Sequence, residues 1–204
     1  MNTEEKRRAR TRLKALRRGL AAEDVLTRGA AVQARLLSTP QYRSARTVAL
    51  YAALSGEVPT GDIFAAALRE GKTVVFPIVP RDGRLMTFRS VESPAHLDRT
   101  GNLAIPEPLG LRPEVALSTI DLFVVPGLGF SRTGDRLGRG AGYYDTTLSS
   151  APPATPRIGL AFSEQVLDTL PVDRDDVPMH FVVTEGGILA ASGAPEGVLG
   201  APSK

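Results

Sequence analysis

The feature that most constrains this fold is a series of short apolar runs that alternate with helical segments. The clearest run is residues 121–125, Asp-Leu-Phe-Val-Val, whose length and β-branched content are typical of a buried strand. Similar patterns predict further strands at 47–51, 73–77, 84–91, 157–162 and 181–184. Helices are predicted at 3–37 with a break near 19–22, at 63–70, at 143–150 and around 164–170. This alternation predicts an α/β fold, a mostly parallel sheet with helices on both faces.

The chain has 204 residues, which fits a single domain, and we expect that domain to span residues 1–190. Residues 92–119 are predicted as a long connection, and residues 191–204 as a flexible C-terminal tail. The absence of cysteine excludes a disulfide scaffold, a thiolate zinc site and a cysteine nucleophile. Two histidines, His96 and His180, are too few for a multi-histidine metal site. With no apolar run of about 18 residues and no signal-peptide pattern, the sequence predicts a cytoplasmic protein without a membrane segment.

Positive charge is concentrated at the N-terminus. Residues 1–20 hold eight basic and two acidic residues, whereas the whole chain has a formal net charge of +3. On a helical wheel, Lys6, Arg10 and Arg17 lie beside a narrow apolar stripe that includes Leu13 and Leu16. Three interpretations stay open: a solvated helix face, a helix that brings selected cations to a polyphosphate ligand, and a nucleic-acid-binding arm. No aromatic residue lies among these charges, which disfavours single-strand binding.

Candidate chemistry is concentrated at residues 126–145, between the clearest predicted strand and a predicted helix. In open α/β sheets, ligands bind beyond the carboxyl ends of the strands. Gly138, Gly140 and Gly142 alternate here, so the backbone can approach a ligand closely, while Arg136 and Arg139 supply donors suited to phosphate. The segment has neither a Walker A nor a Gly-x-Gly-x-x-Gly pattern. It therefore indicates either an anion-binding loop of unspecified ligand or a structural glycine turn.

Arg-Leu-Gly-Arg-Gly-Ala-Gly-Tyr-Tyr-Asp at 136–145 resembles the signature of the 5-formyltetrahydrofolate cyclo-ligase family. The resemblance extends, in the family's order, to Lys6 with Arg10 and to the blocks at 55–60, 105–108 and 178–185. It implies a three-layer, Rossmann-like domain that cyclises 5-formyltetrahydrofolate to 5,10-methenyltetrahydrofolate with ATP and Mg2+, releasing ADP and phosphate. In that reaction ATP phosphorylates the formyl oxygen, N10 attacks the activated carbon, and no enzyme nucleophile is needed.

The resemblance also implies a role for each matching residue. ATP-binding positions are Lys6, Arg10, Arg136, Leu137, Gly138, Arg139, Gly140, Ala141, Gly142, Tyr143 and Tyr144. Folate-binding positions are Glu57, Met86, Arg139, Gly140, Ala141, Gly142 and Tyr143. Asp145 matches a Mg2+ position. The implied partners are ATP and 5-formyltetrahydrofolate with its polyglutamates, and we expect a monomer that binds neither nucleic acid nor membranes.

Two positions depart from the family pattern. His180 stands where the family commonly has Asp, so either the metal rests on Asp145, phosphates and water, or His180 simply packs. Ala141 stands where members often have Lys or Gly, which removes a phosphate contact. Two other functions remain as alternatives: a catalytically silent relative that binds nucleotide or RNA through the basic helix, and a sugar-phosphate isomerase that needs no ATP.

Overall fold

The computed structural model describes residues 2–99, 105–110 and 112–191 of the chain. The C-terminal tail expected at 191–204 therefore lies, except for Ala191, outside the described residues. Among the described residues, no helix is long and apolar enough to cross a membrane.

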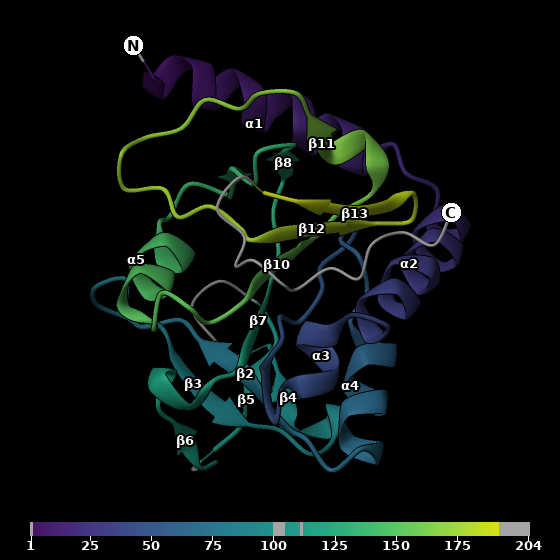
Figure 1. Ribbon diagram of the computed structural model, residues 1–204. Helices are drawn as coiled ribbons and strands as arrows, with labels where there is room; N and C mark the ends of the chain where they lie inside the picture. The colour runs from purple at the N-terminus through teal and green to yellow at the C-terminus, as the bar shows by residue number, and fades with distance from the viewer. Residues whose placement is uncertain (1, 100–104, 111, 192–204) are drawn as a thin grey trace.

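An eight-stranded sheet forms the centre of the molecule (Figure 1). Its strand order is β13 (Gly187–Ala190), β12 (Phe181–Thr184), β10 (Arg157–Leu160), β7 (Leu122–Val125), β1 (Thr47–Ala49), β2 (Thr73–Ile78), β3 (Thr87–Ser90) and β6 (Glu114–Val115). The five strands from β12 to β2 are parallel, and β13, β3 and β6 join the edges antiparallel. The prediction of a mostly parallel α/β sheet is thus confirmed.

Helices lie on both faces of this sheet. Five are present in the described residues: α1 (Asn2–Arg18), α2 (Ala22–Leu37), α3 (Pro40–Ser44), α4 (Gly61–Arg69) and α5 (Tyr143–Ser150). In Figure 1, α2, α3 and α4 lie on one side of the sheet and α5 on the other, while α1 crosses above it beside β8 and β11. The predicted break in the first helical segment and the bounds of the helix at 143–150 agree with the structure.

Two apolar cores result from the alternation of side chains along the buried strands. Leu122 and Val124 face α2, α3 and α4, where they pack in one cluster with Val32 and Ile63. Phe123 and Val125 face the other side, in a cluster with Leu148 of α5 and Phe130. A smaller third cluster anchors α1, whose Leu13 packs against Leu128, Leu137 and Leu170. This contact places the basic helix over the segment that follows β7.

Some short elements differ from the sequence prediction. The helix expected around 164–170 is wrong: a single 3-10 turn, η3 (Ser163–Gln165), is followed by β11 (Val166–Leu167). β11 pairs with β8 (Gly129–Ser131), which also pairs with β9 (Arg136–Leu137), so tertiary pairing overrides the local helical pattern. The strand expected at 84–91 is confined to 87–90.

The long connection also contains small elements. It holds the 3-10 turns η1 (Pro94–His96) and η2 (Leu117–Thr119) and the pair β4 (Leu97–Asp98) with β5 (Glu107–Pro108), besides β6. The strand β13 and the helix α3 were not expected from the sequence. Pro40 ends the preceding helical pattern and occupies the first turn of α3, where proline is tolerated.

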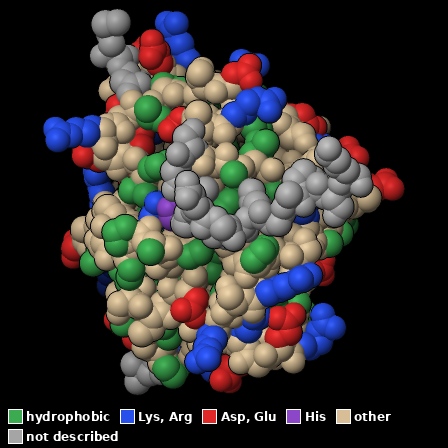
Figure 2. All heavy atoms as spheres, in the orientation of Figure 1, with side chains coloured by type: hydrophobic (Ala, Val, Ile, Leu, Met, Phe, Trp, Pro, Cys, Tyr) green, Lys and Arg blue, Asp and Glu red, His purple; other side chains and the backbone are tan. Residues whose placement is uncertain are grey.

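Charges of both signs occur along α1. Glu4 pairs with Arg7 at 2.7 Å and with Arg8 at 3.0 Å, and all three side chains are exposed. Figure 2 shows basic and acidic side chains interspersed at the top of the molecule, where α1 lies. The exposed side of the N-terminal helix is therefore partly neutralised by its own acids.

Candidate active site

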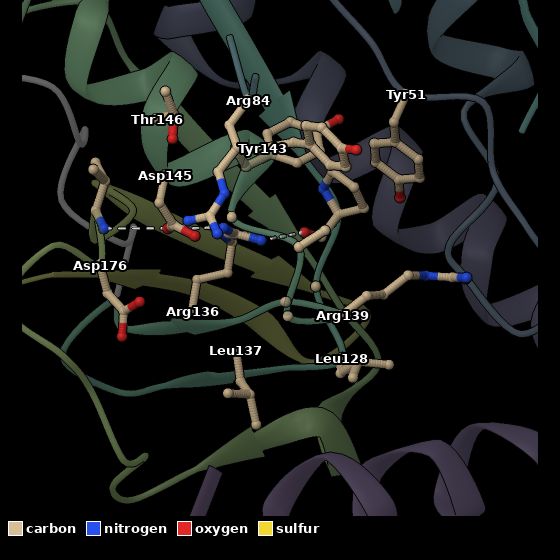
Figure 3. A pocket seen from close by; sticks show the side chains of 18 of the residues that line it. Tyr51, Arg84, Leu128, Arg136, Leu137, Arg139, Tyr143, Asp145, Thr146 and Asp176 are labelled. Atoms are coloured by element: carbon tan, nitrogen blue, oxygen red, sulfur yellow. Dashed lines mark hydrogen bonds and ion pairs between the residues drawn. The ribbon is translucent and has the colours of Figure 1, made fainter. Parts of the chain in front are cut away.

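A cavity of about 810 Å³ opens at the carboxyl ends of β1, β2 and β7, in the size range of small-molecule sites. It is lined by residues that follow these strands, by α1, by the loop before α5 and by residues 173–178 (Figure 3). Every residue that the sequence predicted for the site lies on its wall: Lys6, Arg10, Glu57, Met86, Arg136, Leu137, Gly138, Arg139, Gly140, Ala141, Gly142, Tyr143, Tyr144 and Asp145. Segments far apart in the sequence thus meet at one cavity.

The loop from 138 to 142 has a backbone that needs glycine. Gly140 and Gly142 have φ angles of 106° and 77°, in the left-handed region that other residues rarely adopt. Gly142 is the N-cap of α5 and makes no side-chain capping hydrogen bond, and it lines the cavity together with the first residues of α5. Arg10 donates from Nε to the carbonyl oxygen of Gly138 at 3.1 Å, which ties α1 to this loop. Helix starts and glycine loops of this kind favour anions.

Arg136 is fixed at the base of the cavity. Its guanidinium is buried and donates from Nη2 to Asp145 Oδ1 at 2.9 Å, as Figure 3 shows. The same guanidinium lies over the ring of Tyr144, 5.3 Å from the ring centroid. Burial raises the pKa of the Tyr144 hydroxyl, and the Arg136 charge offsets only part of that rise. Tyr144 therefore keeps its proton, and Arg136 is a preorganised positive charge.

Glu57 is a buried carboxylate in the turn after β1. Its Oε1 accepts from Arg17 Nη1 at 3.1 Å and from Arg139 Nη2 at 3.3 Å, and its Oε2 accepts from the Leu54 amide at 2.9 Å. Arg17 was not among the predicted site residues, although it lay in the same sector of the helical wheel as Lys6 and Arg10. That shared sector was the sequence feature that could have indicated a place for Arg17 at the site.

Lys6 is held by acidic residues of the segment before β12. Its ammonium is 2.6 Å from Asp173 Oδ2 and also contacts Asp176 Oδ2. Burial alone would lower the pKa of Lys6, but hydrogen bonds to Asp173 and Asp176 outweigh it and raise that pKa. Neither aspartate was predicted from the sequence; the acidic run at 173–176, matched to a basic N-terminus, was the only signal.

Met86 and Glu107 line the cavity beside β2. Met86 is buried, and its amide donates to Thr147 Oγ1 of α5 at 3.0 Å. Glu107 Oε1 accepts from the Val79 amide at 3.2 Å, while burial raises the pKa of this carboxyl group. Glu107 belongs to the block at 105–108 that matches the family, but it was not assigned to the site from the sequence.

Asp145 fits the role of a single magnesium ligand. Its Oδ1 accepts from Arg136 Nη2 at 2.9 Å and from the Val177 amide at 3.3 Å, and the residue lines the cavity. Mg2+ is often bound by one or two carboxylates plus substrate phosphates, so one such ligand is compatible with a nucleotide site. Within the described parts of the chain, no cluster of three or more His, Cys, Asp or Glu side chains is arranged to hold a metal.

His180 does not join this site. It precedes β12 and contacts Arg157 at the start of β10, so it lies at the amino ends of these parallel strands, opposite the cavity. Its Nε2 is 2.8 Å from Arg157 Nη2, and its Nδ1 accepts from the Arg157 amide at 3.3 Å. Burial and the Arg157 charge lower the pKa of His180 to about 4. Of the two sequence-based interpretations, the packing role agrees with the structure.

Fold and cavity together define an α/β protein with a cavity at the carboxyl edge of its sheet, lined by both basic and acidic side chains. A family model described as the 5-formyltetrahydrofolate cyclo-ligase family matches residues 2–185. A 5-formyltetrahydrofolate cyclo-ligase from Mus musculus is 33% identical over 192 residues, covering 88% of this chain and 93% of the relative. One from Escherichia coli K12 is 32% identical over 171 residues, covering 82% and 93%.

A solved structure gives the same result for the fold. The Aquifex aeolicus 5,10-methenyltetrahydrofolate synthetase has a TM-score of 0.80 and 30% identity to this chain, with 98% of this chain and 99% of that one covered. The chain belongs to the 5-formyltetrahydrofolate cyclo-ligase family. It is an enzyme of that class, a ligase of folate one-carbon metabolism.

Proposed function

We propose that this enzyme couples ATP to the closure of the folate ring in two steps. The formyl oxygen of 5-formyltetrahydrofolate attacks the γ-phosphorus of ATP, and ADP leaves. N10 then attacks the activated carbon to form the new C–N bond and loses its proton. Phosphate departs with the original formyl oxygen, which leaves 5,10-methenyltetrahydrofolate. The charges of the reacting phosphoryl group are those that positioned cations stabilise.

The observation that carries this proposal is the meeting of two kinds of group in one cavity. A glycine loop flanked by Arg10, Arg136 and Arg139 is suited to a triphosphate, while the buried carboxylate of Glu57 is suited to the N–H groups of a pterin. Both surround the same 810 Å³ space. Two substrates bound there are neighbours, which is what a direct transfer between them requires.

Nucleotide binding is assigned to α1 and to the loop before α5. Lys6 and Arg10 lie one helical turn apart on the same face of α1, and Arg10 already contacts the loop at Gly138. The backbone from Arg136 to Tyr144 would follow the triphosphate, with Arg136 held in place by Asp145. The phosphates would draw Lys6 from its contacts with Asp173 and Asp176, since they offer it a denser negative charge.

Folate binding is assigned to the opposite wall. Glu57 would accept from the pterin, Met86 and the ring of Tyr143 would pack against it, and residues 139–142 would contact both substrates. Asp145 would hold Mg2+ together with the nucleotide phosphates. That ion would neutralise charge on the transferring phosphoryl group.

The oligomeric state, the compartment and the binding partners of the enzyme are also part of the proposal. We propose a monomer that acts in the cytoplasm, takes folate polyglutamates and does not bind nucleic acid. The ion pairs of Glu4 with Arg7 and Arg8, and the mixed charges visible in Figure 2, disfavour a nucleic-acid arm. The Arabidopsis thaliana relative is named as mitochondrial, so the compartment differs within the family.

Isotope transfer tests the proposed mechanism directly. 5-Formyltetrahydrofolate carrying ¹⁸O in its formyl group is converted with unlabelled ATP, and the phosphate released is analysed by mass spectrometry. The proposal predicts one ¹⁸O atom in each phosphate. Unlabelled phosphate, with ¹⁸O released to water, would contradict phosphorylation of the formyl oxygen even if the enzyme consumes ATP.

A further inference from the structure

Arg17 lies at the end of α1, where the helix passes the turn that follows β1. Its side chain is almost fully buried, at 6% exposure, although it ends in a guanidinium group. Nη1 donates to Glu57 Oε1 at 3.1 Å, and Nη2 donates to the carbonyl oxygen of Ser55 at 2.9 Å. The guanidinium therefore holds both the carboxylate of Glu57 and the backbone that carries it.

The turn itself is packed closely on the helix at this point. Gly56 has a φ of +73°, and a Cβ there would lie 2.9 Å from the carbonyl oxygen of Arg17. Any side chain would push the turn away from α1. Glu57 also has an internal contact, because its amide donates to the Leu54 carbonyl at 2.9 Å. The position of the carboxylate thus depends on the contact between α1 and the turn.

Two arginines share Glu57 Oε1, but their surroundings differ. The Arg17 side chain is 6% exposed, whereas that of Arg139 is 52% exposed and lies on the glycine loop. Among the described residues, the hydroxyls of Tyr51 and Tyr144 also interact electrostatically with Glu57, and burial raises the pKa of both. Arg17 is therefore the fixed cationic partner of Glu57, and Arg139 is the partner that has room to move.

We propose that Arg17 is a positioning residue for folate: it holds the Glu57 carboxylate toward the cavity while Arg139 turns to the substrates. This inference rests on the folate role proposed for Glu57. A carboxylate buried without a cation is strongly disfavoured, so a site that releases Arg139 needs a second, permanent partner. Because α1 also carries Lys6 and Arg10, one helix supports the proposed nucleotide and folate walls.

The test compares Arg17→Met and Arg17→Lys with a matched control, Arg18→Met. Arg18 is the next residue on the same helix and is exposed. Arg17→Met removes the charge and both hydrogen bonds, and we expect the KM for 5-formyltetrahydrofolate to rise about tenfold or more. The KM for ATP is expected to stay within about twofold. Arg17→Lys restores the charge without the fork geometry and should recover part of the loss. Arg18→Met should match the parent protein.

Direct measurement of ligand binding tests the inference independently of the catalytic rate. Calorimetric titration with 5-formyltetrahydrofolate and, separately, with a non-hydrolysable ATP analogue measures each site alone, and thermal melting checks the fold of each variant. Equal loss of both affinities, or no loss of folate affinity in Arg17→Met, would overturn the inference. If Arg17→Met does not fold, the test rests on Arg17→Lys. A folate affinity of Arg17→Lys equal to that of the parent protein would then overturn the inference. The two proposals can fail separately. If the parent protein binds folate but releases unlabelled phosphate in the isotope experiment, the proposed mechanism is contradicted, and the role of Arg17 is not.

Discussion

Arg139 and Glu57, which are 82 positions apart in the sequence, meet across the cavity with Nη2 3.3 Å from Oε1. This contact joins the glycine loop before α5 to the turn after β1. The loop carries the groups proposed for the nucleotide, and the turn carries the carboxylate proposed for folate. A residue that reaches both walls is well placed to respond to both substrates.

Arg139→Ala should therefore lower kcat/KM about tenfold or more, since a hydrogen bond to a charged group contributes about 1.5–3 kcal/mol. The effect should appear with either substrate varied. Arg132→Ala is the control, because Arg132 forms an exposed ion pair with Asp168 and does not line the cavity. Steady-state kinetics equal to those of the parent protein in both variants would argue against the assignment of the loop.

Glu57→Gln should abolish or strongly weaken folate binding while leaving nucleotide binding in place. The amide keeps the size of the side chain and an acceptor for Arg17, but it loses the charge that pairs with pterin N–H groups. Calorimetry with each ligand separates the two effects. A folate affinity equal to that of the parent protein would remove Glu57 from the substrate site.

Lys6→Met should raise the KM for ATP about tenfold, whereas Lys14→Met should not change it. Lys6 is buried at the cavity, while Lys14 lies on the exposed side of the same helix. The comparison separates a selected nucleotide contact from a general basic surface. If the two variants change ATP or RNA binding equally, the basic helix acts as a nucleic-acid arm instead.

Asp145→Asn should shift activity to higher Mg2+ concentrations, since it weakens the carboxylate proposed to bind the ion. His180→Asp serves as the comparison because His180 lies at the amino ends of β10 and β12, away from the cavity. Its Mg2+ titration should match that of the parent protein. A tighter Mg2+ requirement in His180→Asp would place this position near the metal after all.

His180 should also make folding stability depend on pH. The folded protein holds its pKa at about 4, below the unfolded value of about 6.5, so the unfolded chain binds more protons between these values. Stability is therefore full above pH 6.5 and falls as the pH decreases toward 4. Urea unfolding at pH 7 and pH 4.5 should show the parent protein losing about 2 kcal/mol more than His180→Gln. An equal loss in both proteins would show that His180 does not titrate in this way.

Short, continuous apolar runs made the central strands predictable. Residues 47–49, 73–78 and 122–125 form buried strands because their apolar side chains have two cores to fill, one on each face of the sheet. Short elements were not predictable in the same way. The local pattern predicted Val166 and Leu167 as part of a helix. In the structure they form a parallel strand pair with Phe130 and Ser131, a contact that only the folded chain creates.

The candidate site likewise contains residues that the sequence predicted and residues that it did not. The blocks around Lys6, Glu57 and residues 136–145 were recognisable because each carries a local pattern, whereas Met86 was assigned only by its matching position in the family. The fold brings all of them to one cavity. Arg17, Asp173 and Asp176 carry weaker signals, a position on the helical wheel and a short acidic run, and neither signal identifies their partners. Their partners lie 40, 167 and 170 positions away, so their roles follow from tertiary packing. The position of His180 opposite the cavity was likewise beyond a pattern of residues.

The most direct measurement of the central claim is a coupled assay of product and nucleotide. Purified protein is mixed with 5-formyltetrahydrofolate and Mg2+, ATP starts the reaction, and the near-ultraviolet band of the methenyl product is followed while ADP is quantified. The proposed reaction predicts a rise that requires ATP, with one ADP formed for each methenyl group. A rise without ATP, or no rise from folded protein that binds both substrates, would contradict it.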